Sequence, residues 1–135
     1  MGVAALWLYH AVLMTLGFVS LVTGMLIARY LKRRRWWLKA HQMMGILGSI
    51  LLISGLFMAI YMVSLSTGVH FRVPHAYLGA IVLVLVVINP ILGYAQLKYP
   101  SKAAKIRSIH RWFGYLALVL ILINIIAGLV LVGII

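Results

Sequence analysis

Four histidines are spaced so that imidazole chemistry is possible. His10, His41, His75 and His110 each lie near the beginning of a long apolar segment. Imidazole is a common metal ligand and proton carrier. The chain has no Cys, Asp or Glu, which excludes carboxylate pairs, Ser-His-Asp triads, Mg²⁺–phosphate sites, thiolate nucleophiles and iron–sulfur clusters. The histidines are therefore the main candidates for chemistry.

The positions that follow these histidines repeat at fixed offsets. Gly, Asn and Gly occupy offsets +4, +14 and +18 from both His75 and His110. Gly occupies offsets +7 and +14 from both His10 and His41. At about 100° per residue, all these offsets fall within about 40° of the histidine on a helical wheel. Each helix would carry one narrow stripe of these residues: His10, Gly17, Gly24; His41, Gly45, Gly48, Gly55; His75, Gly79, Asn89, Gly93; His110, Gly114, Asn124, Gly128.

The composition indicates that membrane-spanning helices position the histidines. Of the 135 residues, 66% are hydrophobic and 9% are charged, whereas soluble domains average about 45–50% apolar and about 25% charged residues. A helix needs about 20 apolar residues to cross a bilayer. We therefore expect an all-α fold, an integral membrane antiparallel four-helix bundle that forms a single domain over residues 1–135. The expected spans are about 3–30, 37–66, 74–99 and 102–135.

Three prolines and one serine predict helix boundaries and one kink. Pro74 suits the first turn of the third helix. Pro90 should kink that helix and free a backbone carbonyl that needs a partner from a neighbouring helix. Pro100 ends the third span, and Ser101 is a candidate cap for the fourth. The first segment lacks the basic start of a secretory signal, so we expect it to be retained as a span.

Basic residues predict the orientation in the cell membrane. Eleven of the twelve Lys and Arg lie in or beside residues 29–39 and 98–111, and only Arg72 lies in the middle loop. Positive residues favour the cytoplasmic side. Loops 29–39 and 98–111 are therefore predicted to be cytoplasmic, and both termini to lie outside. Because the basic residues lie between apolar spans, anionic lipid or an anionic cofactor is the expected counter-charge, and nucleic acid is not an expected partner.

Alternating helix direction sorts the histidines into two depths. His10 and His75 would lie near the outer face, and His41 and His110 near the inner face. A residue 14 to 18 positions past a histidine lies about 21–27 Å further along the helix, at the depth of the other pair. Each helix would thus offer a ligand to one level and a small or amide residue to the other. Haem has this requirement, since iron takes two axial histidines and the macrocycle edge presses against helix backbones. We therefore predict an outer and an inner haem.

Other interpretations of the same residues stay open. A single intramembrane histidine often bridges helices by hydrogen bonds, and glycine stripes often serve only close helix packing. Zinc or copper is the inorganic alternative, although each level supplies two His and no Cys or carboxylate to complete a tetrahedron. His70 is expected to be a solvated loop residue.

Each haem would bring two propionates to a chain without carboxylates of its own. The basic candidates for pairing are Lys39, Arg107 and Arg111, together with Lys105, at the inner level and Arg72 at the outer level. Setting topology and binding anionic lipid is the alternative role for the inner cluster. Asn89 and Asn124 would either hydrogen-bond the haem at the level opposite their own histidine or bridge helices.

Several stretches resemble the four-helix core of the cytochrome b561 family. They are HAVLMTLGFVSLVTGMLIARYLK from His10, WLKAHQMMGILG from Trp37, HAYLG from His75 and SIHRWFGY from Ser108. The chain is most similar to the branch found fused to extracellular DOMON domains. The resemblance implies a transmembrane electron carrier with two b-type haems, bound by His10 with His75 and by His41 with His110. Lys39 occupies the position of a lysine that helps to bind ascorbate in some members, but VPHAY replaces their Ser-Leu-His-Ser-Trp stretch.

These features predict a dihaem cytochrome that carries electrons from a cytoplasmic donor to an outer acceptor. It would be an oxidoreductase if it acts directly on a small molecule. One alternative is an enzyme like the bacterial superoxide oxidase, which reduces quinone, and another is a non-redox transporter or membrane anchor. Expected partners are membrane lipid and a small-molecule or protein donor and acceptor. A homodimer is also compatible with the sequence.

Overall fold

A computed structural model describes residues 3–135 as four long helices. The helices are α1 (Val3–Tyr30), α2 (Trp37–Ser66), α3 (Pro74–Lys98) and α4 (Ala103–Leu131), with a short 3₁₀ helix, η1 (Pro100–Lys102), before α4. No strand occurs within this described range. The all-α four-helix fold expected from the sequence is confirmed.

Two helix boundaries differ from the expected ones, near Pro100. The third helix ends at Lys98, because Tyr99 precedes a proline and has the non-helical angles φ −118° and ψ 80°. Ser101 lies within η1 and caps nothing by its side chain. Lys102 takes the N-cap position of α4, without a side-chain cap hydrogen bond. The expected serine cap is therefore wrong.

The last helix is also shorter than expected, since α4 ends at Leu131 and does not reach Ile135. Gly133 has a φ of 73°, in the left-handed region that favours glycine. Its N–H donates to the carbonyl of Val130, and the Ile134 N–H donates to Leu129. This bond pattern closes a helix end and turns the chain away from the axis.

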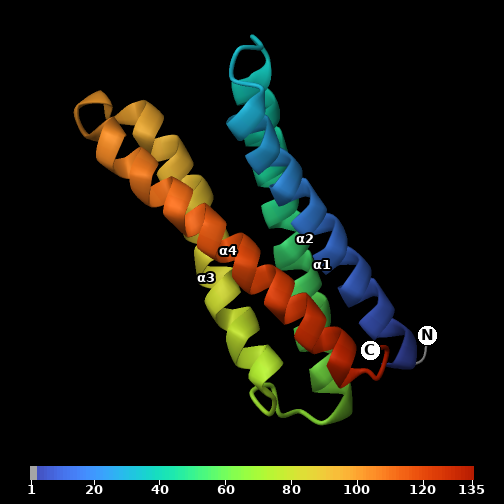
Figure 1. Cartoon of the computed structure of the whole chain (residues 1–135). Helices are drawn as coiled ribbons and strands as arrows, with labels where there is room; N and C mark the ends of the chain where they lie inside the picture. Colours follow the sequence, from blue (N-terminus) through green and yellow to red (C-terminus); the bar gives the residue numbers. More distant parts are fainter. Residues whose placement is uncertain (1–2) are drawn as a thin grey trace.

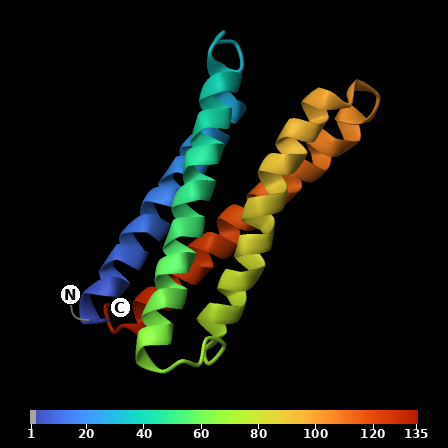
Figure 2. The same cartoon turned by 180° about the vertical axis from the view of Figure 1, so that it is seen from behind.

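The helices form two antiparallel hairpins, α1–α2 and α3–α4, that cross each other (Figure 1). Packing is most extensive within each hairpin, and the hairpins meet through α1 with α4 and through α2 with α3. This order leaves α1 opposite α3, and α2 opposite α4. The view from behind shows the α1–α2 and α3–α4 turns at one end, and the α2–α3 loop with the C-terminus at the other (Figure 2).

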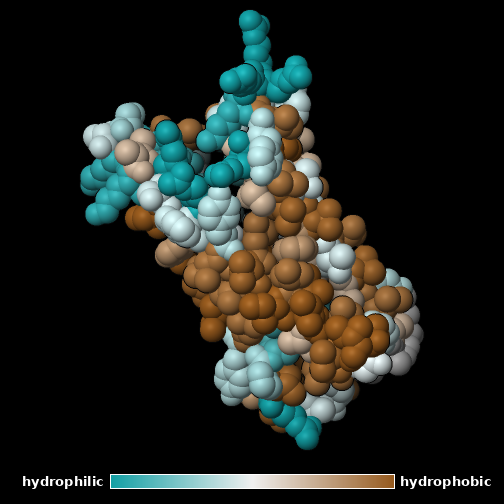
Figure 3. All heavy atoms as spheres, in the orientation of Figure 1, coloured by the Kyte–Doolittle hydropathy of each residue, from teal (hydrophilic) through white to brown (hydrophobic). Residues whose placement is uncertain are grey.

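A small central core joins the hairpins, and most other apolar side chains face outward. The buried core consists of Met14, Leu52, Val82, Leu85, Val86, Ala117 and Ile121. All four helices are long and apolar enough to cross a membrane. An apolar band covers the middle of the molecule, with hydrophilic atoms gathered over the two hairpin turns (Figure 3). Helices that are hydrophobic all round suit a lipid environment.

Pro90 is accommodated inside α3 with help from α2. Proline cannot donate to the carbonyl four residues earlier, which here belongs to Val86. The hydroxyl of Ser49 lies 3.5 Å from that carbonyl oxygen and also donates to the carbonyl of Gly45 at 2.9 Å. The expected partner from a neighbouring helix is therefore Ser49, a buried side chain of α2.

Candidate metal centre

The histidines form two pairs across the diagonals of the bundle. The ring centroids of His10 on α1 and His75 on α3 are 6.1 Å apart, and the ring planes meet at 86°. Those of His41 on α2 and His110 on α4 are 6.0 Å apart, at 84°. The structure therefore brings together the same pairs that the sequence predicts. His70 lies in neither pair. It is exposed in the α2–α3 loop, with its Nε2 3.4 Å from the Ser64 hydroxyl.

In the first hairpin, each histidine donates a hydrogen bond to the backbone of the partner helix. The Nδ1–H of His10 donates to the carbonyl oxygen of Gly55 at 2.7 Å. The Nδ1–H of His41 donates to the carbonyl oxygen of Gly24 at 2.8 Å. The two bonds are reciprocal, because Gly24 stands at offset +14 from His10 and Gly55 stands at offset +14 from His41.

The second hairpin repeats this arrangement with asparagine in place of glycine. The Nδ1–H of His75 donates to the carbonyl oxygen of Asn124 at 3.0 Å, and that of His110 to Asn89 at 2.9 Å. Each acceptor again stands at offset +14 from the histidine of its own helix. Because this offset spans about 21 Å of an α-helix, the two histidine pairs lie at two depths separated by about that distance.

These hydrogen bonds also determine which ring nitrogen is free to bind a metal. A carbonyl oxygen can only accept, so Nδ1 must carry the proton in all four rings. A neutral imidazole protonated at Nδ1 keeps its lone pair at Nε2. Metal-binding histidines usually have this arrangement, with the second nitrogen donating to a carbonyl or carboxylate that fixes the tautomer. All four side chains are thus prepared to bind a metal through Nε2.

The separation within each pair matches two axial ligands of one iron. A metal–imidazole nitrogen bond is about 2 Å long and the nitrogen lies about 1 Å from its ring centroid, so two imidazoles on opposite sides of one metal have centroids about 6 Å apart. The observed 6.1 and 6.0 Å agree with this requirement. The described residues contain no group of three or more His, Cys, Asp or Glu side chains that could hold a bare metal ion. The donor set therefore suits haem, whose macrocycle supplies the other ligands.

Two glycines of the second hairpin lie directly against histidine rings. An ideal Cβ on Gly128 would be 3.0 Å from Cε1 of His75, and one on Gly93 would be 3.2 Å from Cε1 of His110. The sequence predicts that small residues at this offset leave space for a macrocycle. In the structure, the ring of the histidine on the partner helix lies in this space.

The glycines of the first hairpin mainly allow α1 and α2 to approach closely. A Cβ on Gly17 would be 2.7 Å from Cγ of Leu52, and one on Gly48 would be 2.7 Å from Cδ2 of Leu21. Close helix packing, one of the alternatives left open above, therefore accounts for these positions. Gly45 differs, because a Cβ there would meet no atom within 4 Å.

The two asparagine side chains lie against glycines one turn past the histidines. Nδ2 of Asn124 is 3.4 Å from the Cβ position of Gly79, and Nδ2 of Asn89 is 3.1 Å from that of Gly114. The Oδ1 atoms of both asparagines are buried and have no hydrogen-bond partner among the described residues. Their backbone carbonyls hold the histidines, a role that the sequence analysis did not predict. The shared +14 offset was the signal that could have revealed it.

The basic candidates lie at the expected ends and are exposed. Lys39, Arg107 and Arg111 belong to the end that carries His41 and His110, while Arg72 lies in the α2–α3 loop near His75. The Nε–H of Arg107 donates to Oε1 of Gln96 at 3.3 Å. Trp37 packs beside His41, with ring centroids 6.5 Å apart. Exposed cations therefore lie at both ends of the bundle, three of these four at the end that carries His41 and His110.

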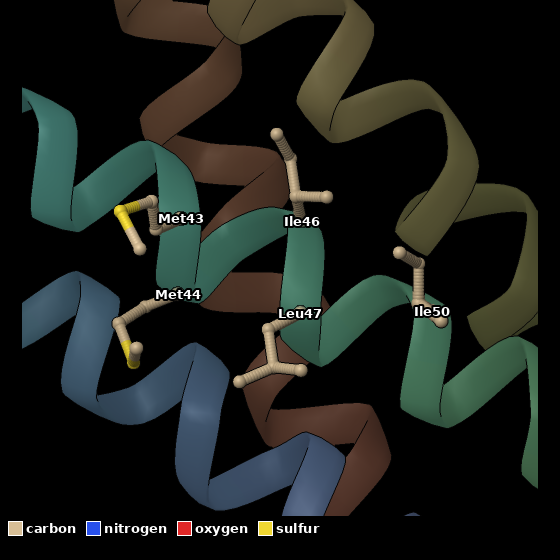
Figure 4. A pocket seen from close by; sticks show the side chains of 5 residues that line it. All are labelled: Met43, Met44, Ile46, Leu47 and Ile50. Atoms are coloured by element: carbon tan, nitrogen blue, oxygen red, sulfur yellow. The ribbon is translucent and has the colours of Figure 1, made fainter.

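Two shallow depressions on the sides of the helices are apolar and contain no histidine. One lies on α2 and is lined by Met43, Met44, Ile46, Leu47 and Ile50 (Figure 4). The other lies on α1 and is lined by Ala11, Val12, Thr15 and Leu16. Both suit lipid chains and neither adds a candidate redox site.

Comparison with known protein families gives a match over most of the chain. The protein-family model described as "Eukaryotic cytochrome b561" matches residues 9–130. This range contains all four paired histidines, all four carbonyl acceptors and both basic stretches. No curated protein and no solved structure matches the chain.

Proposed function

The chain belongs to the cytochrome b561 family, and from that premise we propose that it carries electrons through two b-type haems from a cytoplasmic donor to an outer acceptor. As a member of this haem-binding family with four membrane-spanning helices, it is an integral membrane b-type cytochrome that acts in electron transfer. The number of haems, their ligands and the direction of transfer belong to the proposal. The closer similarity to the DOMON-associated branch stays a prediction.

The observation that carries the proposal is the pair of matched histidine sites. Each site has two imidazoles with centroids about 6 Å apart, and each imidazole has its Nδ1–H held by a carbonyl of the adjacent helix. His10 with His75 would hold the outer haem, and His41 with His110 the inner one. Bound haem supplies a one-electron iron couple.

The residues favour electron transfer without atom transfer. Two histidines at each level would both hold one iron, and they would leave no position on it for a substrate. The chain has no carboxylate or thiol that could act as a general acid, base or nucleophile beside them. Donors and acceptors would therefore exchange electrons at the two ends of the bundle.

Basic side chains give the two levels different surroundings. We assign Lys39, Arg107 and Arg111 to the propionates of the inner haem and Arg72 to those of the outer haem. All four are exposed, and the chain itself contains no Asp or Glu to pair with them. Charges near a haem tune its potential. The basic end would face the cytoplasm by the positive-inside rule.

Haem stoichiometry tests the proposal directly. Protein expressed with haem supply should contain two haems per chain and show a low-spin spectrum typical of bis-imidazole ligation. His10→Ala and His41→Ala should each reduce the ratio from two to one, because each removes one ligand of a different pair. His70→Ala is the matched control and should keep two, since His70 is an exposed loop residue.

Two outcomes would contradict the proposal. A single haem in the unaltered chain would disprove two sites, and the absence of a bis-imidazole spectrum would favour a non-redox anchor or transporter. Electron transfer itself is measured with vesicles that enclose ferricyanide and receive a reductant outside. Both histidine variants should slow ferricyanide reduction, while His70→Ala should not.

A further inference from the structure

The two ligands of each proposed iron site are held in different ways. In the second hairpin, His75 donates to the carbonyl of Asn124, and Gly128 lies one helical turn further on the same face of α4. Cε1 of His75 is 3.0 Å from the position of a Cβ on Gly128, and Nδ1 is 3.5 Å from it. The imidazole therefore lies across the backbone between residues 124 and 128.

The same arrangement recurs at the other depth. His110 donates to the carbonyl of Asn89, and Gly93 lies one turn further along α3. Cε1 of His110 is 3.2 Å from the position of a Cβ on Gly93, and Nδ1 is 3.5 Å from it. The two histidines of the second hairpin thus make the same contacts with the partner helix.

The first hairpin has no such glycines. The +18 positions counted from His10 and His41 are Ala28 and Ala59, which already carry a Cβ. His10 and His41 still reach their acceptors, Gly55 and Gly24. Each histidine pair therefore contains one ring that lies against a glycine one turn beyond its carbonyl acceptor and one ring that has alanine at that position.

An added methyl group would act directly on the ligand. Separations of 3.0 and 3.2 Å are tighter than nine in ten real Cβ contacts, so the imidazole must give way by a few tenths of an ångström. Helix backbone is on one side of the ring, and the Nδ1 hydrogen bond and the facing histidine restrict the other movements. The imidazole has only two side-chain torsions and would tilt away from its carbonyl.

We propose that Gly128 and Gly93 are positioning residues that each orient one axial histidine, Gly128 through His75 at the outer level and Gly93 through His110 at the inner level. This inference rests on the proposed function and adds how ligand orientation is controlled at each level. A hydrogen bond donated by Nδ1–H to a carbonyl makes the imidazole a more basic ligand at Nε2. Weakening that bond should favour ferrous iron and raise the midpoint potential of one haem.

The test is a redox titration of haem-loaded Gly128→Ala and Gly93→Ala, read from the absorption spectrum. Gly128→Ala should raise one midpoint or lose one haem of the two, and Gly93→Ala should do the same to the other. The same glycine substitutions in variants that keep only one haem show which haem each glycine affects. In His41→Ala, which keeps the His10–His75 site, only Gly128→Ala should have an effect, and in His10→Ala only Gly93→Ala should.

Gly17→Ala is the matched packing control. Its Cβ would be 2.7 Å from Cγ of Leu52, a tighter contact than those of Gly128 and Gly93 and one that involves no histidine. It should lower thermal stability and leave both midpoints unchanged. Gly93→Ala, with the looser 3.2 Å contact, keeps the test valid if Gly128→Ala does not fold.

The outcomes separate this inference from the proposed function. Two haems in the unaltered chain with midpoints unchanged in both glycine variants would overturn only the positioning role. Equal shifts of both haems in one glycine variant, or the same shifts in Gly17→Ala, would also overturn it. An unaltered chain with fewer than two haems would overturn the two-site proposal as well.

Discussion

Glycine has several distinct roles on the histidine-bearing faces of these helices. Gly93 and Gly128 contact the rings of His110 and His75, while Gly17 and Gly48 allow α1 and α2 to pack closely. Gly45 has neither role, because a Cβ there would meet nothing within 4 Å. It lies one turn past His41 on the same face of α2. We therefore predict that Gly45, which was not among the positions at offsets +14 and +18 first expected to do so, gives clearance to a haem edge.

Gly45→Ala should reduce haem binding without reducing the stability of the haem-free chain. Without haem, the variant should be as stable as the unaltered chain or up to about 1 kcal/mol more stable, since alanine has the higher helix propensity. With haem supplied, the added methyl should reduce occupancy of the inner level. Thermal unfolding of haem-free protein and the haem-to-protein ratio measure the two effects.

Gly17→Ala is the control for the thermal unfolding measurement, because its added methyl group would clash with Leu52. It should destabilise the haem-free chain by about 1–3 kcal/mol, the usual effect of overpacking. A normal haem ratio in Gly45→Ala would show that clearance for the macrocycle does not depend on this position.

At the scale of elements, α3 depends on α2 where proline interrupts its hydrogen bonds. Pro90 leaves the Val86 carbonyl without its intrahelical donor, and the Ser49 hydroxyl is the nearest replacement at 3.5 Å. The hydroxyl shares its single proton with the Gly45 carbonyl, which is closer at 2.9 Å. The interhelical bond is therefore weak, and its effect on stability should be small.

Ser49→Ala should destabilise the bundle by no more than about 0.6 kcal/mol, the average for an interhelical hydrogen bond in a membrane protein. In a Pro90→Ala background the same change should cost less, because residue 90 then donates to Val86 itself. A double-mutant cycle of unfolding in detergent measures this coupling. Additive effects of the two substitutions would mean that Ser49 does not compensate for Pro90.

The whole molecule consists of two hairpins that each contribute one histidine to each pair. Reciprocal hydrogen bonds hold both histidines within a hairpin, whereas the two histidines of each pair come from different hairpins. The hairpins contact each other less than their own helices do. Bound haem would thus join α1 to α3 and α2 to α4 across the diagonals, and would stabilise the bundle by linkage.

Orientation in the membrane is testable because the chain has no cysteine. Ser101→Cys in η1 and Val69→Cys in the α2–α3 loop introduce exposed thiols at opposite ends. In intact cells, a membrane-impermeant maleimide should label Val69→Cys but should label Ser101→Cys only after permeabilisation. The reverse pattern would place the basic end outside and invert the proposed direction of electron transfer.

Much of this architecture follows from the sequence alone. Apolar length predicted the four spans, and the first two helices have the expected bounds. Alternating helix direction predicted two depths, and the ring pairs His10–His75 and His41–His110 lie together as expected. These features are local, because rise and rotation per residue are fixed in any α-helix. A side chain at offset +14 from a histidine must therefore share its face at the other depth.

Only the tertiary structure decided which neighbour each face meets. Helical periodicity does not determine how far each helix is rotated about its axis or how closely two helices approach. These quantities decided that the carbonyls of Gly24, Gly55, Asn89 and Asn124 hold the four Nδ1 atoms. They also decided that Gly93 and Gly128 contact imidazoles while Gly17 contacts Leu52. Side chains from distant parts of the sequence determine these contacts, so the stripes predicted the positions but not their roles.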